Sequence, residues 1–242
     1  MKVVIAPMIW KRPQVFEVFA EGIKILKGRF DNVEFIIHCV GSEGEESKQR
    51  AKAHGFNYTE APNYPLSEKA QIRLEEVRKY KPDYWLSLSD DDFITPSYFA
   101  YILNLMFEGY EYIAPYDIYY YRNGSIYYSY GYPQHHRRNG EPLAIGRCVS
   151  FELMDRIDWN LWGENTIDRG LDRDAYTILN DKAKSKHFFN CRDIGGMVVD
   201  VKSNVNKSAW TSRHERHKVT DHADLLFDYR LTKKLNNVPH AR

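Results

Sequence analysis

The segment Tyr84-Trp85-Leu86-Ser87-Leu88-Ser89-Asp90-Asp91-Asp92 decides how this sequence folds. It begins as an apolar run of strand length and leads directly into three consecutive carboxylates. A largely apolar run of this kind indicates a strand that is buried on both faces, as in a parallel sheet covered by helices. Because ligands bind beyond the carboxyl ends of such strands, the acidic triplet lies where a site is expected.

The residues before this segment alternate between strand and helix patterns. Strands are predicted at 3–9, 33–40, 56–59 and 84–89, and helices at 15–26, 45–54 and 67–79. Such alternation is typical of parallel strands joined by crossover helices. The predicted fold class is therefore α/β, with a mostly parallel central sheet flanked by helices on both faces.

The second half of the chain has a different pattern, which predicts a small antiparallel addition to the sheet. A hairpin is expected over 118–130, because Asn123-Gly124 is a strong turn signal between two Tyr-rich arms. The other expected elements are helices at 96–107, 171–180 and near 222–235, strands at 110–115 and 147–151, and a strand pair within 188–201. No linker or repeat divides the chain, so a single domain over 1–242 is expected.

The composition excludes several classes of protein. Hydrophobic residues make up 43% of the chain, which is enough for a core, and 34 Lys+Arg against 33 Asp+Glu exclude a global basic field. The three cysteines (Cys39, Cys148 and Cys191) match no zinc or redox spacing, so reduced thiols are expected. No run is long enough to span a bilayer, and Met1–Ala6 is typical of a first strand and not of a signal peptide. We expect a soluble, cytoplasmic protein.

The acidic triplet is the first candidate site. Adjacent carboxylates repel one another unless a cation screens them, and Mn²⁺ and Mg²⁺ prefer oxygen ligands. In extended chain Asp90 and Asp92 lie on the same side, so both can reach one metal ion. The alternative is an acidic turn that caps the helix beginning at Pro96.

Three segments resemble one enzyme family. Trp10-Lys11-Arg12-Pro13, Asn63-Tyr64-Pro65-Leu66-Ser67-Glu68-Lys69 and Ser89-Asp90-Asp91-Asp92-Phe93 occur in the order and spacing seen in GT-A glycosyltransferases, particularly the inverting, family 2-like enzymes. Phage enzymes that modify DNA bases are one candidate subset. The resemblance implies a nucleotide-sugar-binding half over 1–115, and an acceptor-binding half with a C-terminal tail over 116–242.

The resemblance also implies site residues. The triplet resembles the DxD motif of the family, which implies that Asp90 and Asp92 bind Mn²⁺ or Mg²⁺ and the donor diphosphate. The implied donor-binding residues are Pro7, Trp10, Arg12, Ser42, Lys69, Asp90 and Asp91. For Lys69 the alternative is an ordinary solvated helix face. The family often has an Asp after the second strand, and Val40-Gly41-Ser42 stands there in this chain, so the donor base stays open, with UDP expected.

An inverting transfer needs a carboxylate that takes the proton from the acceptor hydroxyl. Gly170-Leu171-Asp172-Arg173-Asp174 resembles the acidic motif that carries this base, with Asp172 favoured over Asp174 and Glu164 third. The alternative is that these Asp residues stabilise a helix start through its dipole, by about half a kcal/mol each.

Two further groups are candidates for metal and acceptor binding. His214 and His217, with His222, could complete the metal site from the C-terminal tail. The candidate acceptor-binding residues are Tyr128, Tyr130, His135, Arg137 and Trp162. Aromatic rings beside a basic run suit a sugar polymer or a nucleic acid, although ordinary packing of the hairpin explains the tyrosines equally.

The sequence thus predicts a metal-dependent glycosyltransferase that moves a sugar from a nucleotide-diphosphate donor to the hydroxyl of a glycan or of a hydroxymethylated DNA base. A nucleotidyltransferase is one alternative, but the loop over 7–13 lacks the glycines of a phosphate loop. A non-catalytic module that binds sugar or nucleic acid is the other.

Overall fold

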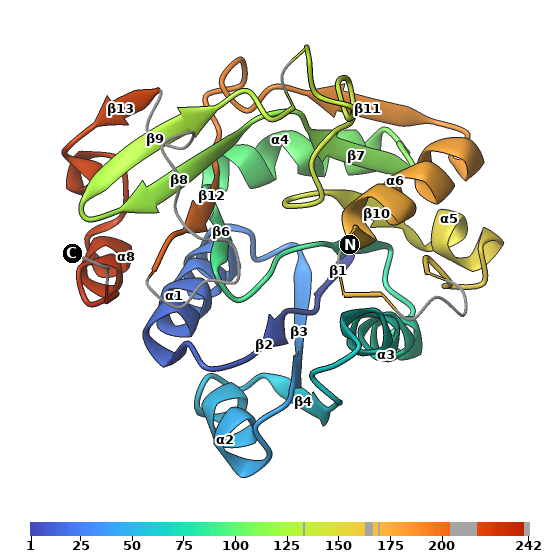
Figure 1. Cartoon of the computed structure of the whole chain (residues 1–242), viewed down its shortest axis with the longest axis horizontal. Coiled ribbons are helices and arrows are strands. Elements are labelled where there is room, and N and C mark those ends of the chain that lie inside the picture. Colours follow the sequence, from blue (N-terminus) through green and yellow to red (C-terminus); the bar gives the residue numbers. More distant parts are fainter. Residues whose placement is uncertain (133, 163–166, 169, 204–216, 240–242) are drawn as a thin grey trace.

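The computed structural model describes residues 1–132, 134–162, 167–168, 170–203 and 217–239 and contains two sheets (Figure 1). In spatial order the first sheet consists of β11 (Lys186–Phe189), β7 (Tyr112–Pro115), β10 (Cys148–Ser150), β5 (Tyr84–Leu86), β1 (Lys2–Ile5), β3 (Glu34–Gly41) and β2 (Met8–Ile9), while β4 (Asn57–Glu60) also pairs with β3. Its pairings are parallel except for those of β10 with β5 and β7. The predicted mostly parallel sheet is confirmed.

Helices cover both faces of this sheet, as predicted. The helices on one face are α1 (Pro13–Arg29) and α4 (Pro96–Phe107), and those on the other are α3 (Leu66–Lys79), α5 (Phe151–Arg156) and α6 (Leu171–Lys182). Along β5 the side chains alternate, because Tyr84 and Leu86 join the first core and Trp85 joins the second. Each fully buried side chain of this size stabilises the fold by about 1.5–3 kcal/mol. The remaining helix of the N-terminal half, α2 (Glu45–Ala53), leads into β4.

The second sheet is the predicted antiparallel-rich addition. It has the order β13 (Lys218–Thr220), β9 (Ser125–Ser129), β8 (Ile118–Arg122), β12 (Val198–Val201) and β6 (Asp92–Ile94). The hairpin β8–β9, at the upper left of Figure 1, turns at Asn123 and Gly124, whose φ angles are 50° and 78°. Both angles are positive, as a tight two-residue hairpin requires.

The structure corrects the prediction in three places. The two strands expected as a pair within 188–201 lie in different sheets, because β11 joins β7 and β12 joins β8 and β6. The predicted strand over 3–9 is divided into β1 and β2. The C-terminal helix expected over 222–235 is a 3₁₀ turn, η1 (Ala223–Leu225), followed by the short helix α8 (Tyr229–Leu235). Strand pairing joins residues far apart in sequence, so local periodicity cannot reveal it.

The C-terminal helix α8 packs beside α1 (Figure 1). Lys234 Nζ lies 2.5 Å from Glu17 Oε2 across this contact, and Leu231 and Leu235 are buried beneath it. Over the described part of the chain, no helix has the length and apolarity needed to cross a membrane.

Gly196, between β11 and β12, allows two backbones to pass in contact. A Cβ atom added there would lie 2.7 Å from Tyr98 Cα and 2.8 Å from Tyr98 N, which are backbone atoms of α4. We therefore expect Gly196→Ala to lower the free energy of unfolding by about 1–3 kcal/mol, as overpacking does. Urea denaturation measures this loss. The control is Gly28→Ala in α1, where a Cβ meets nothing within 4 Å and stability is expected to stay or to rise by up to about 1 kcal/mol. Equal stability of both variants would contradict the close approach.

Candidate functional site

A cleft of about 730 Å³ opens beyond the end of β5. Five groups of residues line it: the loop before α1, the start and first turns of α3, the acidic triplet, the segment 143–147, and the start of α6. Asp200 and Lys202, in and just after β12, line it from the second sheet. The cleft therefore lies at the carboxyl end of a strand of a mostly parallel sheet, where ligands bind in such folds.

The acidic triplet lies where the chain leaves the first sheet for the second. Asp90 and Asp91 follow the strand end, and Asp92 already belongs to β6, which is paired with β12. This pairing sets Asp92 opposite Asp200. The Asp92 carboxylate accepts a hydrogen bond of 2.7 Å from the backbone N–H of Ser89, which closes the turn between the sheets. The alternative of an acidic helix cap does not describe this arrangement, because Thr95 caps α4.

Arg12 joins two carboxylates of the triplet. Its guanidinium contacts Asp90, and its second terminal nitrogen lies 2.5 Å from Asp91 Oδ2. Asp90 is fully buried and also accepts a hydrogen bond from the backbone of Trp10. The loop before α1 is thereby fixed against the end of β5.

Burial dominates the electrostatics of this cluster. Burial raises the pKa of Asp90 to about 7, although Arg12 opposes the shift, and it raises the pKa of Asp200 to about 6, although Lys202 opposes that. The pKa of Asp92 is also raised well above its ordinary value, first by burial and then by the charge of Asp91. Carboxylates crowded in this way are stabilised by any cation that reaches them.

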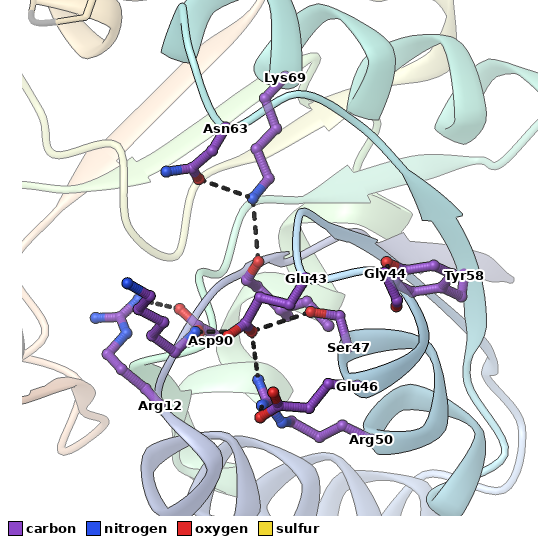
Figure 2. Close-up of polar contacts among 12 residues, drawn as sticks. Arg12, Glu43, Gly44, Glu46, Ser47, Arg50, Tyr58, Asn63, Lys69 and Asp90 are labelled. Carbon is purple, nitrogen blue, oxygen red and sulfur yellow. Dashed lines mark hydrogen bonds and ion pairs between the residues drawn. The ribbon is translucent and has the colours of Figure 1, made fainter.

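Lys69 extends from α3 toward Ile9, at the start of the loop that precedes α1 (Figure 2). It is 2% exposed, and its Nζ donates to Ile9 O at 3.0 Å and to Asn63 Oδ1 at 3.5 Å. Burial lowers its pKa to about 8, against the opposing charges of Asp90 and Glu43. Lys69 is therefore not on a solvated face, and both of its hydrogen-bond acceptors are neutral.

Figure 2 also shows Glu43, which holds the loop after β3. Its Oε2 accepts hydrogen bonds from the Lys11 backbone N–H at 2.9 Å, from Ser47 at 3.0 Å and from Arg50 at 3.2 Å. Because these donors come from two elements, Glu43 ties the loop before α1 to α2. It supports the cleft from outside, as it does not line it.

The opposite end of the cleft is basic and aromatic. Arg73 lies over the ring of Trp85, at 5.1 Å from its centroid, and within 5.9 Å of that of Trp162. Arg147 donates from Nε to Ala144 O at 3.2 Å, and its terminal nitrogen lies 3.5 Å from Asp172 Oδ1. Asp172, in the first turn of α6, has a side chain that is 59% exposed.

The cleft brings together many of the residues singled out from the sequence. Those that line it are Trp10, Arg12, Lys69, Asp90, Asp91, Asp92, Trp162 and Asp172. Those that do not line it are Pro7, Ser42, Asp174, Tyr128, Tyr130, His135, Arg137 and His217. His214 and Glu164 lie outside the described residues.

Tyr128 and Tyr130, at the end of the hairpin, pack against neighbouring side chains. Tyr128 is buried, and its hydroxyl donates to Asp117 Oδ2 at 3.0 Å. Tyr130 is exposed and packs edge-on against Tyr128 and His217, with ring centroids 4.8 Å and 5.1 Å apart. The alternation of residues along the chain therefore did not predict that Tyr128 is buried and Tyr130 is exposed.

Five charged residues of the cleft were missed by the sequence reasoning: Arg73, Arg147, Asp168, Asp200 and Lys202. Asp200 and Lys202 are separated in sequence from the triplet by more than a hundred residues, and only the pairing of β12 with β6 joins them to it. The one available signal for them was a charge within an apolar strand and an opposite charge just after it, since charged residues are rarely buried unless paired.

Several oxygens of the cluster are of the type that binds a hard divalent cation. Asp90 Oδ2 and Asp200 Oδ1 are buried oxygens without a hydrogen-bond partner, and such oxygens suit Mg²⁺ or Mn²⁺. Across the described ranges, however, no three His, Cys, Asp or Glu side chains are grouped so that they could hold a metal ion. Arg12 takes up oxygens of Asp90 and Asp91, and it would have to share them with a metal ion. The oxygens therefore suit a cation by type, but the described side chains form no three-ligand group for it, and Arg12 competes for two of the carboxylates.

No protein-family model matches the chain, and no curated protein matches its sequence. Its fold is similar to solved structures of S. aureus TarS. TarS 1–349 in complex with UDP aligns with a TM-score of 0.58 and 10% identity, over 84% of this chain and 61% of that one. A second structure of TarS 1–349 aligns with a TM-score of 0.55 and 10% identity, over 78% of this chain and 60% of that one. The longer TarS chain aligns with a TM-score of 0.57 and 10% identity, over 84% of this chain and 36% of that one.

The chain thus spans about 60% of the length of TarS 1–349. At 10% identity the likeness establishes the fold. It is the predicted GT-A arrangement of a mostly parallel sheet between helices, extended by a second, antiparallel-rich sheet.

The Asp200–Lys202 pair gives a test of the electrostatic arrangement. The two groups lie 2.5 Å apart, and their side chains are 17% and 6% exposed. We expect Lys202→Met to lower the free energy of unfolding by about 3 kcal/mol, because it removes the cation beside a buried carboxylate. Thermal denaturation measures this loss, and adding Asp200→Asn is expected to restore part of it.

The control for this test is Lys218→Met. Lys218 pairs with Asp221 at an exposed site, so its loss is expected to cost less than about 1 kcal/mol. If both lysine variants were equally stable, the cluster around the triplet would not depend on Lys202.

Proposed function

We propose that this protein is a glycosyltransferase that moves a sugar from a nucleotide-diphosphate donor to an acceptor hydroxyl. The observation that carries the proposal is the acidic triplet at the passage from one sheet to the other, in a cleft that also contains Arg12 and Lys69. The GT-A fold and the resemblance of the three N-terminal segments to GT-A enzymes agree with it.

The donor is proposed to be a UDP-sugar. The likeness to a TarS structure that contains UDP supports this choice. Trp10 lies half-buried at the cleft and offers a ring for the base, while Lys69 and Arg12 are cations that suit phosphate oxygens. Lys69 is the best placed of them, because neither of its present hydrogen-bond acceptors is charged.

A divalent cation, Mn²⁺ or Mg²⁺, is proposed as cofactor. Asp90 and Asp92 would hold it, with Asp200 as a further carboxylate beside them. When bound, such a cation neutralises the charge that develops on the departing diphosphate. The residues of the chain share that task, since Lys202 and Arg12 lie at the same carboxylates and can approach the leaving group.

Asp172 is proposed as the general base of an inverting transfer. It lines the cleft, its carboxylate is exposed enough to receive an acceptor, and Arg147 holds it from one side. Asp174 belongs to the same first turn of α6 but does not line the cleft. A carboxylate at this place can take the proton of the attacking hydroxyl while the opposite end of the cleft holds the diphosphate.

The acceptor is proposed to be a glycan or a hydroxymethylated DNA base. The rings of Tyr132 and Trp162 line the cleft near Asp172, and aromatic faces pack against sugars and stack on bases. His135 and Arg137 are exposed outside the cleft, where they could contact the phosphates of a longer acceptor.

The donor site is tested by calorimetric titration of UDP and UDP-glucose with and without Mn²⁺. We expect binding to require Mn²⁺ and to weaken at least tenfold in Asp92→Ala, because the variant removes a buried carboxylate from the cluster. Asp224→Asn, an exposed position in η1, is the control and is expected to bind as the wild type does. If no nucleoside diphosphate bound under any metal condition, the proposed glycosyltransferase function would be wrong.

The catalytic assignment predicts a separation of binding from turnover. We expect Asp172→Asn to lower the rate of sugar transfer by about 10²–10⁴-fold, because the amide cannot accept the acceptor proton. UDP affinity should not change, and Asp174→Asn should retain most of the activity. Release of UDP in the presence of acceptor measures the rate. Loss of activity in the Asp174 variant alone would exchange the two roles.

A further inference from the structure

Arg73 and Arg147 are two buried cations to which the proposed transfer gives no contact with the substrate. Arg73, on α3, is 7% exposed, and Arg147, just before β10, is 3% exposed, yet both line the cleft. Burying a guanidinium costs several kcal/mol unless hydrogen bonds and an opposite charge compensate it. The hydrogen bonds and opposite charges around each arginine therefore show whether it could also bind a ligand.

Arg73 receives little compensation from the described chain. Its Nε is buried without a hydrogen-bond partner, and no hydrogen bond joins its guanidinium to any other described residue. Its contacts are with the faces of Trp85 and Trp162. Aromatic faces attract a cation but leave its N–H groups free to donate to another group.

Arg147 and Asp172 complete the surroundings. Arg147 donates a hydrogen bond from Nε to the Ala144 carbonyl. Its terminal nitrogen lies 3.5 Å from Oδ1 of Asp172, whose side chain is mostly exposed. Burial, followed by the charge of Arg147, lowers the pKa of Arg73 to about 10, against the weaker opposing effect of Asp172. The carboxylates that line this end of the cleft are those of Asp172, which is mostly exposed, and of Asp168, which accepts a hydrogen bond of 2.8 Å from the backbone N–H of Leu66.

We infer that Arg73 and Arg147 form an oxyanion subsite that binds a carboxylate or phosphoryl group of the substrate, next to the hydroxyl that Asp172 activates. The inference rests on the proposed function, because Asp172 is its reference point. The planar, multiple N–H donors of arginine suit these two groups, and Trp85 and Trp162 fix the plane of Arg73.

This subsite is separate from the residues proposed for the donor diphosphate. Those residues gather around the acidic triplet, whereas Arg73 lies between the two tryptophans and Arg147 beside the start of α6. A diphosphate held near the triplet therefore leaves the two arginines for a second anion. The substrate of this enzyme should then carry a negative charge besides the diphosphate.

The first experiment titrates inorganic phosphate into the full chain in the presence of saturating UDP and Mn²⁺, with calorimetry as the readout. We expect the wild type to bind phosphate, and Arg73→Met and Arg147→Met each to bind it at least tenfold more weakly. The variant Arg192→Met is the control, because Arg192 also lies over an aromatic ring, that of Tyr128, and does not line the cleft. Failure of the wild type to bind phosphate would overturn the inference.

UDP affinity separates this inference from the proposed function. It should be the same in the wild type and in both arginine variants, since the donor residues are unchanged. If UDP did not bind any of them, the proposed donor would be wrong, and the phosphate titration without UDP would still decide the subsite. Unchanged phosphate binding in Arg73→Lys and Arg73→Met alike would overturn the inference and leave Arg73 a packing residue.

Two further titrations locate the source of the anion. Tighter binding of UDP-glucuronate than of UDP-glucose, lost in Arg147→Met, would assign the anion to the donor sugar. Binding of glucose 6-phosphate but not of glucose to the UDP-loaded protein, lost in the same variant, would assign it to the acceptor. Equal behaviour of the charged and neutral member in both pairs would overturn the inference.

Discussion

The structure depends on the contact between Arg12 and the carboxylates of Asp90 and Asp91. At this point the chain leaves the end of β5 in the first sheet and enters the second sheet as β6. Three consecutive carboxylates at a buried crossing would repel one another, and burial raises the pKa values of Asp90 and Asp92 accordingly. The positive charges that compensate these carboxylates come from Arg12, Lys69 and Lys202. The same three residues line the cleft at the acidic triplet.

Stability and binding are thus linked in this cleft. The buried oxygens of Asp90 and Asp200 that lack hydrogen-bond partners, and the buried Nε of Arg73 that lacks one too, are each less stabilised than an ordinary core group. Such groups cost stability in the free protein and gain partners when a ligand arrives. The cleft has cations at both of its ends, as the binding of a substrate with two separated anionic groups would require.

Much of the fold could be predicted from the sequence, because its N-terminal elements follow local rules. The run from Tyr84 is apolar on both faces, Asn123-Gly124 has the φ angles that a tight hairpin needs, and Pro96 begins a helix after Thr95. In the candidate site, Arg12, Lys69, the triplet and Asp172 were found by their resemblance to GT-A segments, and each of them lines the cleft. Pro7 and Ser42 were named by the same resemblance and do not line it, and neither do Tyr128 and Tyr130, which were named from the aromatic pattern of the hairpin.

The sequence by itself determined the α/β class, the position of the acidic triplet at a strand end, and the hairpin, since each depends on residues that are neighbours along the chain. Only the tertiary structure decided that β11 and β12 belong to different sheets, that Asp200 lies opposite Asp92, and that Arg73 and Arg147 share one end of the cleft. The physical reason is that strand pairing and burial join residues that lie more than a hundred positions apart, as Asp92 and Asp200 do. A local pattern of polar and apolar residues does not indicate which distant charged residue will pair with a given one.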